Sequence, residues 1–136
     1  MLAIAALLVA IFLPMLPRGT SRPRLQSYAV AVAALLKADH NAAVRRGIPV
    51  ATEVEAASRL VRSGASGRVV RIPEDVAVDA LLSARCGRYG SALVIRFFSS
   101  GISCGGTIAL TRLGVGYEIR VNWLTGGIDI VSLARS

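Results

Sequence analysis

The change from helix to sheet falls within Ala43-Val44-Arg45-Arg46-Gly47-Ile48-Pro49-Val50. Two arginines in a last helical turn, a glycine directly after them and a proline two residues further on form a typical helix stop. Upstream of this stop, apolar residues recur every three or four positions, as on one face of a helix. They are Leu25, Ala29, Val32 and Leu36, with Ala43 one residue out of step. We therefore predict an amphipathic helix that is capped by Gly47.

Downstream of Pro49 the apolar residues follow every second position, which is the period of a β-strand with one buried face. The alternating residues are Val76, Val78, Ala80 and Leu82; Leu93, Ile95 and Phe97; Ile108 and Leu110; Tyr117, Ile119, Val121 and Trp123; and Ile128 and Ile130. Turns rich in glycine and serine separate these segments at 63–67, 86–90, 99–101 and 125–127. Short strands joined by short turns pair antiparallel. We predict an α+β fold in which a long N-terminal helix packs on a small antiparallel meander that curls into a sandwich.

The chain begins with an uninterrupted apolar segment, Leu2 to Leu13, which is followed by Pro14, Pro17 and Arg18. The sixteen residues before Pro17, taken as one helix, span roughly 24 Å, which is less than the ~30 Å of a hydrocarbon core. A cleaved signal peptide is the alternative, but no basic residues precede the apolar segment and no small-x-small site follows it. We expect that the natural chain starts further upstream and that Met1 is an internal methionine.

The formal charge of the chain is +8, and it is unevenly distributed. Through Gly47, six basic residues face one acid, which gives +5; the remaining ten arginines and seven acids give +3. Such an excess suits anionic lipid headgroups or nucleic acid, whereas the +3 on the later part is typical of a solubilising surface. Arg18, Arg22 and Arg24 follow the apolar segment, and the positive-inside rule would place such residues in the cytoplasm.

Two cysteines, Cys86 and Cys104, leave two interpretations open. In an oxidising compartment they form one disulfide, which would contribute on the order of 3 kcal/mol; otherwise they are two buried thiols. The predicted strand Leu93–Phe97 lies between them and, at ~3.3 Å per residue, separates the two turns by nearly 20 Å. A disulfide therefore requires one of the turns to fold back over the sheet.

The candidates for catalysis are few. His40 is the single histidine of the chain, and its neighbour Asp39 diverges from it by about 100° on a helix, so the two cannot form a relay. Cys104-Gly105-Gly106 has the form of a nucleophile turn, but there is no second histidine to activate the thiol. We predict no catalytic residue and no enzyme activity.

The candidates for cofactor and metal binding are equally weak. Glu74, Asp75 and Asp79 cluster in sequence and are interpreted as turn and solvent-facing residues. Gly114-Val115-Gly116 lacks the third glycine of a dinucleotide loop and precedes a predicted strand instead of a helix. One histidine and two cysteines do not complete a tetrahedral zinc site by themselves. We predict no cofactor and no metal site.

Two stretches resemble the H-type minor pseudopilins of the bacterial type II secretion system, which are grouped with fimbrial relatives of type IV pili. The first stretch is the helix-to-strand junction at 43–50. The second runs from Phe97 to Ile130 and contains a Gly105-Gly106-Thr107-Ile108 strand start and then Val121-Asn122-Trp123-Leu124-Thr125-Gly126. The apolar segment from Leu2 to Pro14 is similar to the second half of the family's N-terminal transmembrane segment. The resemblance covers nearly the whole chain.

This resemblance implies a pilin-like fold and a structural role in a type II secretion pseudopilus. Residues 1–24 would form the apolar membrane and assembly helix with its neck, and residues 25–136 the periplasmic globular domain. The expected location is the inner membrane, crossed once. The expected partners are the lipid bilayer, the major pseudopilin, other minor pseudopilins and the inner-membrane secretion platform. The family's basic leader and its Gly-Phe-Thr-Leu-x-Glu cleavage and methylation motif are expected upstream of Met1, and Ser99-Ser100-Gly101 stands where the family has Pro-Asp-Gly.

The alternative function is that of a type IV pilus minor pilin that binds DNA or helps pilus assembly. The charge of +8 favours DNA binding. DNA-binding relatives carry a basic C-terminal tail, whereas the tail here, Ser132-Leu133-Ala134-Arg135-Ser136, has one arginine and no aromatic platform. We therefore expect secretion as the function and do not expect nucleic acid as a partner.

Overall fold

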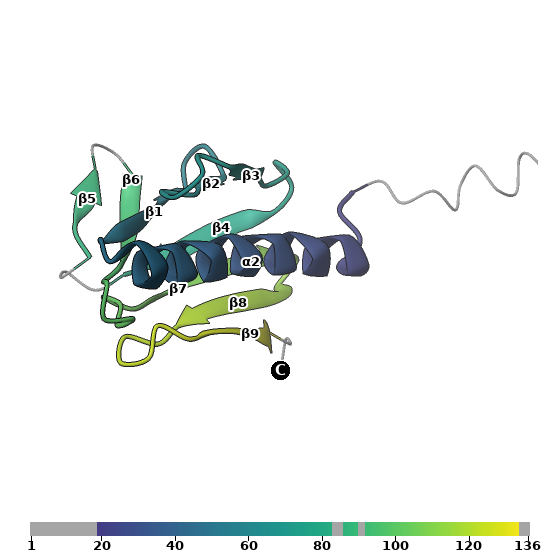
Figure 1. Cartoon of the computed structure of the whole chain (residues 1–136). Helices are drawn as coiled ribbons and strands as arrows, with labels where there is room; N and C mark the ends of the chain where they lie inside the picture. Colours follow the sequence, from purple (N-terminus) through teal and green to yellow (C-terminus); the bar gives the residue numbers. More distant parts are fainter. Residues whose placement is uncertain (1–18, 83–85, 90–91, 134–136) are drawn as a thin grey trace, which may run out of the picture.

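The computed structural model describes residues 19–82, 86–89 and 92–133 of the chain. In this part a long helix, α2, runs from Arg22 to Arg46 and lies across two β-sheets (Figure 1). Ser21 caps its start by accepting a hydrogen bond from the backbone N–H of Arg24 at 3.4 Å. Gly47 caps its end in the left-handed conformation, with φ +67°, and donates its N–H to the carbonyl of Ala43 at 3.0 Å. The predicted helix end at Gly47 is confirmed.

The strands of the described part follow the helix in sequence. They are β1 (Val50–Glu55), β2 (Leu60–Arg62), β3 (Val69–Arg71), β4 (Ala77–Leu81), β5 (Arg88–Tyr89), β6 (Ala92–Phe97), β7 (Gly106–Arg112), β8 (Val115–Val121) and β9 (Ile128–Leu133). Every strand pair among them is antiparallel. The predicted α+β class with an antiparallel sheet domain is therefore confirmed.

The strands form two sheets, and their order differs in part from a single meander. Within the described residues, the first sheet has the order β3-β2-β1-β6-β5 and the second the order β4-β7-β8-β9. Strands β1 to β3 and strands β7 to β9 each form a meander, as predicted. However, β6 returns to pair with β1, and β4 pairs with β7 in the other sheet. The prediction of one continuous meander is therefore wrong, because β6 and β4 each pair with a strand that is not their neighbour in sequence.

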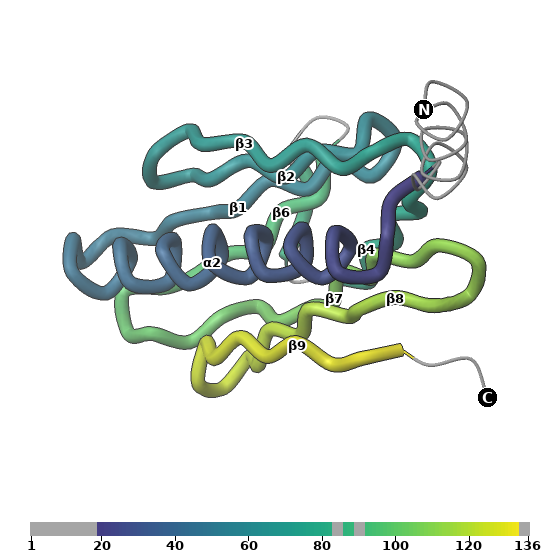
Figure 2. Tube along the Cα trace, turned by 90° about the vertical axis from the view of Figure 1, so that its right-hand side faces the viewer, coloured from purple at the N-terminus to yellow at the C-terminus, as the bar shows by residue number. Residues whose placement is uncertain are grey.

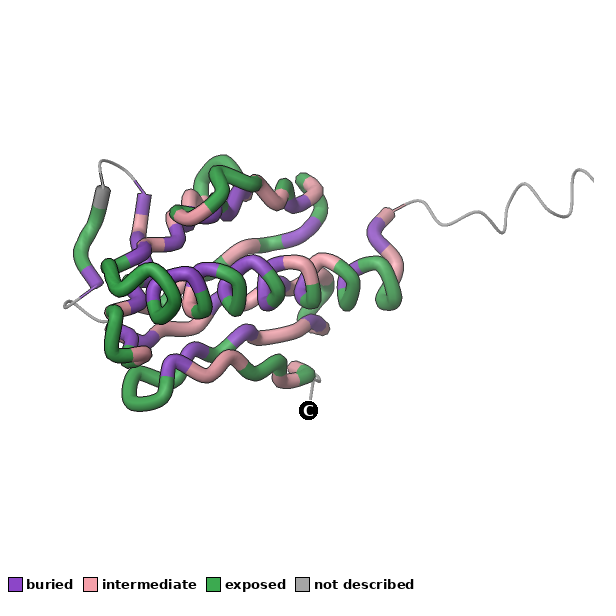
Figure 3. The backbone as a smooth tube through the Cα atoms, viewed as in Figure 1, coloured by how far each residue is buried: buried purple, intermediate pink, exposed green. Residues whose placement is uncertain are grey.

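The core lies between α2 and the two sheets. The helix contacts β1 and β3 on one sheet and β8 and β9 on the other, so it covers the line where the sheets meet (Figure 2). The predicted apolar stripe is buried, and in Figure 3 buried and exposed segments alternate along the helix. The largest fully buried apolar side chains come from both sheets and the helix: Leu36, Val32, Val54, Val61, Val76, Ile95, Phe97, Ile108, Leu110 and Ile119.

Two details of the predicted sheet are wrong. Trp123 does not continue the buried face of β8; the strand ends at Val121, and the side chain of Trp123 is 60% exposed. The reason is Asn122, whose side-chain oxygen accepts hydrogen bonds from the backbone N–H groups of Leu124 and Thr125 and so starts a turn. The predicted turn at 86–90 contains β5, which pairs with the first residues of β6.

Candidate functional site

The residues just before α2 are held to the globular domain by Asp75, which lies between β3 and β4. The backbone N–H of Thr20 donates to Oδ2 of Asp75 at 2.7 Å, and the Thr20 hydroxyl donates to Oδ1 at 2.8 Å. Both carboxylate oxygens are therefore used by a residue 55 positions earlier in the chain. The sequence interpretation of Asp75 as a turn residue is right in position, but it misses this pairing.

Arg112, the last residue of β7, completes the arrangement. Its Nε lies 3.0 Å from Oδ2 of Asp75, and its Nη1 donates to the carbonyl of Thr20 at 3.3 Å. A Cβ atom at Gly19 would lie 2.5 Å from Nη2 of Arg112, so a larger residue there would push the arginine away. We call Thr20, Asp75 and Arg112 the neck cluster. It fixes the point at which the chain preceding α2 joins the domain.

The hydrogen bonds of the neck cluster affect the pKa of Asp75. The backbone amide of Thr20, and next its hydroxyl, lower the pKa of this carboxyl, and the positive charge of Arg112 acts in the same direction. Desolvation opposes these effects. Asp75 is therefore an acceptor in its charged form, and the cluster depends on that charge.

A second acid, Asp39, belongs to α2 and is completely buried on the side that faces the first sheet. It accepts hydrogen bonds from the hydroxyl of Thr52 on β1 at 2.6 Å and from the hydroxyl of Ser63 at 2.5 Å. The backbone N–H groups of Gly64 and Ala65 donate to it at 3.1 and 3.2 Å. Four donors from the first sheet and its β2–β3 turn thus converge on one carboxylate of the helix.

Sequence reasoning misses this role of Asp39, although a signal for it exists. Leu25, Ala29, Val32 and Leu36 alternate spacings of four and three, and the same alternation leads on to positions 39 and 43, so that Ala43 is in step with the stripe after all. Asp39 occupies the first of these two positions. An acid on the buried stripe of a helix indicates a partnered polar group in the core.

His40 lies on another side of the helix from Asp39 and makes structural contacts. Its Nε2 is 2.9 Å from the carbonyl oxygen of Gly101, and its ring meets the ring of Phe97 edge-on at 5.6 Å. The prediction that Asp39 and His40 do not form a relay agrees with these separate contacts. His40 joins the end of α2 to the loop that follows β6.

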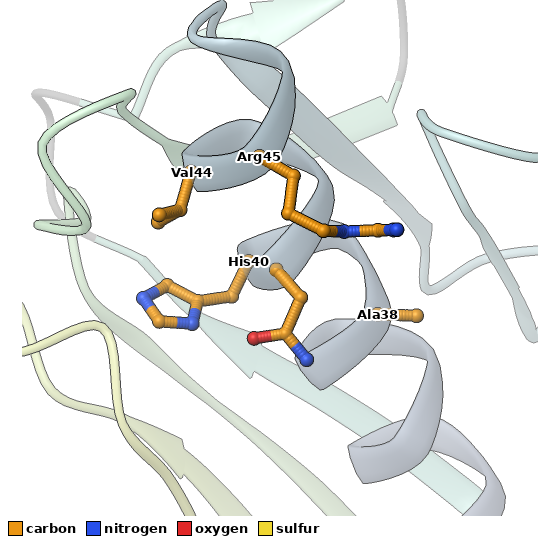
Figure 4. A pocket seen from close by; sticks show the side chains of 5 residues that line it. Ala38, His40, Val44 and Arg45 are labelled. Atoms are coloured by element: carbon orange, nitrogen blue, oxygen red, sulfur yellow. The ribbon is translucent and has the colours of Figure 1, made fainter.

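A shallow pocket of about 470 Å³ beside His40 lacks the convergence that catalysis needs. It is lined by Ala38, His40, Asn41, Val44 and Arg45. Figure 4 shows His40 and Val44 on one side of the helix, and Ala38 and Arg45 pointing to the other side. Titratable side chains that point apart cannot act together on one substrate atom.

A larger groove of about 660 Å³ separates α2 from the β2–β3 hairpin. Its helix side consists of Tyr28, Leu35 and three alanines, and its hairpin side includes Arg68 and Arg71. Among the described residues that line it there is no carboxylate, histidine or cysteine. Across residues 19–82, 86–89 and 92–133, no group of three or more His, Cys, Asp or Glu side chains could hold a metal ion.

Cys86 and Cys104 are brought together by the chain after β6. In the structure their sulfurs are joined in a disulfide, with the Cα atoms 5.2 Å apart. The N–H of Cys104 donates to the carbonyl of Arg96 at 3.2 Å, and Nε of Arg96 donates to the carbonyl of Cys86 at 3.1 Å. The loop after β6 therefore folds back along the strand, which is the geometry that a bond between these two turns requires.

The apolar segment from Leu2 to Leu13 lies outside the described residues, as do Arg18 and the last three residues of the tail. Among the residues that the structure does describe, no helix combines the length and the apolar character needed to cross a membrane.

Comparison with known proteins gives matches in structure. No protein-family model matches the chain, and no curated protein matches its sequence significantly. The type IV minor pilin FimU of Pseudomonas aeruginosa matches with a TM-score of 0.61 and 18% identity, over 82% of this chain and 91% of FimU.

The minor pseudopilin EpsH from the type 2 secretion system of Vibrio cholerae matches equally well. One EpsH structure has a TM-score of 0.61 and 15% identity, over 82% of this chain and 98% of EpsH. A second has a TM-score of 0.59 and 13% identity, over 86% and 96% of the two chains. Both proteins share the long helix on antiparallel sheets, and the chain therefore has the pilin-like fold of minor pilins and minor pseudopilins.

Proposed function

We propose that this chain is a minor pseudopilin, a structural subunit of a type II secretion pseudopilus that supports protein export across the outer membrane. The observation that carries this proposal is the pilin-like fold, shared with EpsH over nearly the whole length of EpsH. The sequence adds an apolar segment, Leu2 to Leu13, on the N-terminal side of the helix. A non-enzymatic role fits the described residues, which contribute structural contacts at His40, Asp39 and the neck cluster.

In this proposal the two ends of the chain have different tasks. Within residues 1–24, the apolar segment anchors the subunit in the inner membrane and later packs against the helices of other subunits. Residues 25–136 form the periplasmic domain, to which Thr20 and the start of α2 are also bound. Burial of apolar surface contributes ~25 cal/mol per Å², so a few hundred Å² of the segment contribute several kcal/mol to insertion or bundling. The partners are the major pseudopilin, other minor pseudopilins, the inner-membrane platform and the lipid bilayer.

The neck cluster supports this division because it binds Thr20, just before α2, to the domain. Through Asp75 and Arg112, Thr20 is held to the segment between β3 and β4 and to the end of β7.

Deletion of the chain from its own cells tests the proposal. We expect secreted proteins to accumulate in the periplasm, and we expect the full chain to restore their export. A charge in the apolar segment, Leu7→Lys, should abolish this restoration, whereas Leu7→Ile, which keeps the segment apolar, should not. Normal secretion after deletion would contradict the proposal.

A second candidate is a subunit of a type IV pilus, which the equal TM-score of FimU favours. Such a subunit would use the same apolar segment and the same domain to help assemble a pilus. The two candidates separate in the deletion strain: loss of surface pili with normal secretion indicates the second, and loss of secretion with normal pili indicates the first. Nucleic acid is not among the proposed partners.

A further inference from the structure

Leu113 lies in a conformation that leucine rarely adopts. The β7–β8 hairpin has a loop of two residues, Leu113 and Gly114, with φ +55° and +78°. Two consecutive left-handed residues are typical of a type I′ turn, where asparagine followed by glycine is strongly preferred. Leucine is disfavoured there because its Cβ crowds the following carbonyl. Here the leucine is also 80% exposed, so it gains little from burial in the domain.

The hairpin tip lies at the end of the domain where the apolar segment enters. Arg112, the residue before Leu113, contacts Thr20 and approaches Gly19 closely. Figure 2 shows the turn between β7 and β8 at the same end of the molecule as the start of α2. Leu113 therefore lies at the same end of the domain as Gly19, from which the chain continues towards its start (Figure 2).

This end carries two exposed cations at the start of α2, while its acid Asp75 is paired with Arg112. Arg22 and Arg24 are exposed in the first turn of α2, and that turn contains no acid. Basic residues at a helix start are unfavourable, because the helix dipole there favours negative charge. Their presence suits an anionic surface outside the molecule.

We propose that this end of the domain rests on the anionic surface of the lipid bilayer, with Leu113 inserted among the lipids and Arg22 and Arg24 against the phosphates. We call Leu113, Arg22 and Arg24 the membrane-facing end. The proposal rests on the proposed function, which places the apolar segment, Leu2 to Leu13, in the membrane. Single exposed apolar residues are common on soluble proteins. Leu113 differs because it combines an unfavourable conformation with a position at the end of the domain where α2 starts, and the exposed cations Arg22 and Arg24 lie at that same end (Figure 2).

A single leucine and two arginines would bind a bilayer only weakly by themselves. The membrane-facing end is, however, tethered by the apolar segment, which keeps it at high effective concentration near the lipid. Under that condition, weak contacts are sufficient to set the orientation of the domain. The effect would be to hold the free subunit in one orientation before it joins a filament.

Tryptophan fluorescence in the full chain tests this proposal. The chain has one tryptophan, Trp123, in the turn after β8 at the opposite end of that strand. Replacing it with Trp123→Phe and adding Leu113→Trp gives a single reporter at the hairpin tip. The protein is reconstituted in phosphatidylethanolamine–phosphatidylglycerol vesicles whose acyl chains carry bromine, which quenches tryptophan on contact. We expect a blue-shifted emission that is strongly quenched.

The matched control is Leu81→Trp in the same Trp123→Phe background. Leu81 is 77% exposed, almost as much as Leu113, and it pairs with Thr107 at the end of β7 away from Arg112. Its emission should be insensitive to bromine, as should that of native Trp123. Equal quenching of the reporters at 81 and 113, or no quenching of either, would overturn the proposal.

The contribution of the arginines has its own comparison. Arg22→Gln with Arg24→Gln should reduce quenching of the reporter at 113 in the anionic vesicles, and vesicles of phosphatidylcholine alone should do the same for the unmodified arginines. If neither change reduces the quenching, the proposed contact with anionic lipid is contradicted. A blue shift without bromine quenching would mean that a second protein chain covers Leu113, and the proposal would be wrong.

Flotation of the vesicles separates this inference from the proposed function. If the full chain does not float with vesicles after a high-salt wash, the membrane anchor itself fails. If it floats while the reporter at 113 remains unquenched, the membrane anchor is supported, and the proposed contact of the membrane-facing end with the bilayer is refuted.

Discussion

Asp39 and Asp75 both hold α2 to the sheets, but they do so in different surroundings. Asp39 is buried and takes its four hydrogen bonds from the first sheet and the β2–β3 turn. Asp75 is partly exposed and binds the start of the helix together with Arg112. Removal of Asp39 should therefore lower the overall stability of the domain. Removal of Asp75 should change how the stability depends on pH.

The substitution Asp39→Ala should lower the free energy of unfolding by about 3 kcal/mol or more, because several buried donors lose their acceptor. Asp39→Asn keeps the volume but turns an amide N–H₂ towards donors, so it should also destabilise the domain. Urea denaturation of residues 19–136 measures both. Lys37→Ala, on the exposed side of the same helix, is the control and should stay within ~0.5 kcal/mol of the wild type. A similarly small loss for Asp39→Ala would contradict the assigned hydrogen bonds.

The contribution of Asp75 should depend on pH in a defined direction. Because the folded domain lowers its pKa, the stabilisation is present above the pKa of the unfolded chain, about 4, and is lost as the pH falls through the lower folded pKa. Wild-type protein should therefore have a higher Tm than Asp75→Asn at neutral pH, and the difference should shrink below about pH 4. Thermal unfolding across this pH range measures it. A difference that does not change with pH would show that the charge of Asp75 is not involved.

The contacts of individual side chains in the site were the least predictable from the sequence. The helix position of Asp39 is readable from the apolar stripe, but its four donors come from β1 and the 63–65 turn, and their approach depends on how the sheet packs. The neck cluster joins positions 20, 75 and 112. Pairs so far apart in sequence leave no periodic signal, because they are set by the tertiary fold.

Among the elements, the helix and the longer strands were predictable and the short ones were not. The stop at Gly47 is a local signal, and the structure confirms it. Strands β2 and β3 have three residues each, which is too short for an alternating pattern to stand out. The error at Trp123 arose because the turn after β8 is started by the side chain of Asn122, which interrupts the alternation.

The β7–β8 hairpin yields a stability prediction. Leu113→Gly should raise the free energy of unfolding by about 1 kcal/mol, because glycine adopts the left-handed conformation without the crowding of a Cβ. Leu81→Gly, in a strand with ordinary backbone angles, should lower it instead. Equilibrium denaturation of residues 19–136 compares the two. If Leu113→Gly destabilised the domain, the side chain would have a structural partner and would not be free to meet a membrane.

The loop after β6 leads to a prediction about the cysteines. In protein isolated from the periplasm, we expect Cys86 and Cys104 to be bonded, with no thiol available for alkylation before reduction. Reduction should lower the stability by ~3 kcal/mol, as for a closed loop of this size. The double variant Cys86→Ala, Cys104→Ala should not respond to reductant. Two free thiols and identical electrophoretic mobility with and without reductant would refute the bond.

At the scale of the whole molecule, α2 covers the line where two sheets meet, and the chain enters at one end of this helix (Figure 1). The neck cluster lies at that entry, so the domain can be cut free before Gly19 without loss of the cap at Ser21 or of the contacts of Thr20. A cut after Arg24 would remove both. Residues 19–136 are thus the natural unit for separating the tasks of the domain from those of the apolar segment.

Complementation with that unit tests the central claim, that the chain is a structural subunit whose apolar segment carries assembly. Residues 19–136 are exported to the periplasm of the deletion strain behind a cleavable signal, and secretion is compared with that restored by the full chain. We expect a folded, mostly monomeric domain that restores no secretion, while the full chain restores it. Full restoration by residues 19–136 alone would contradict the account.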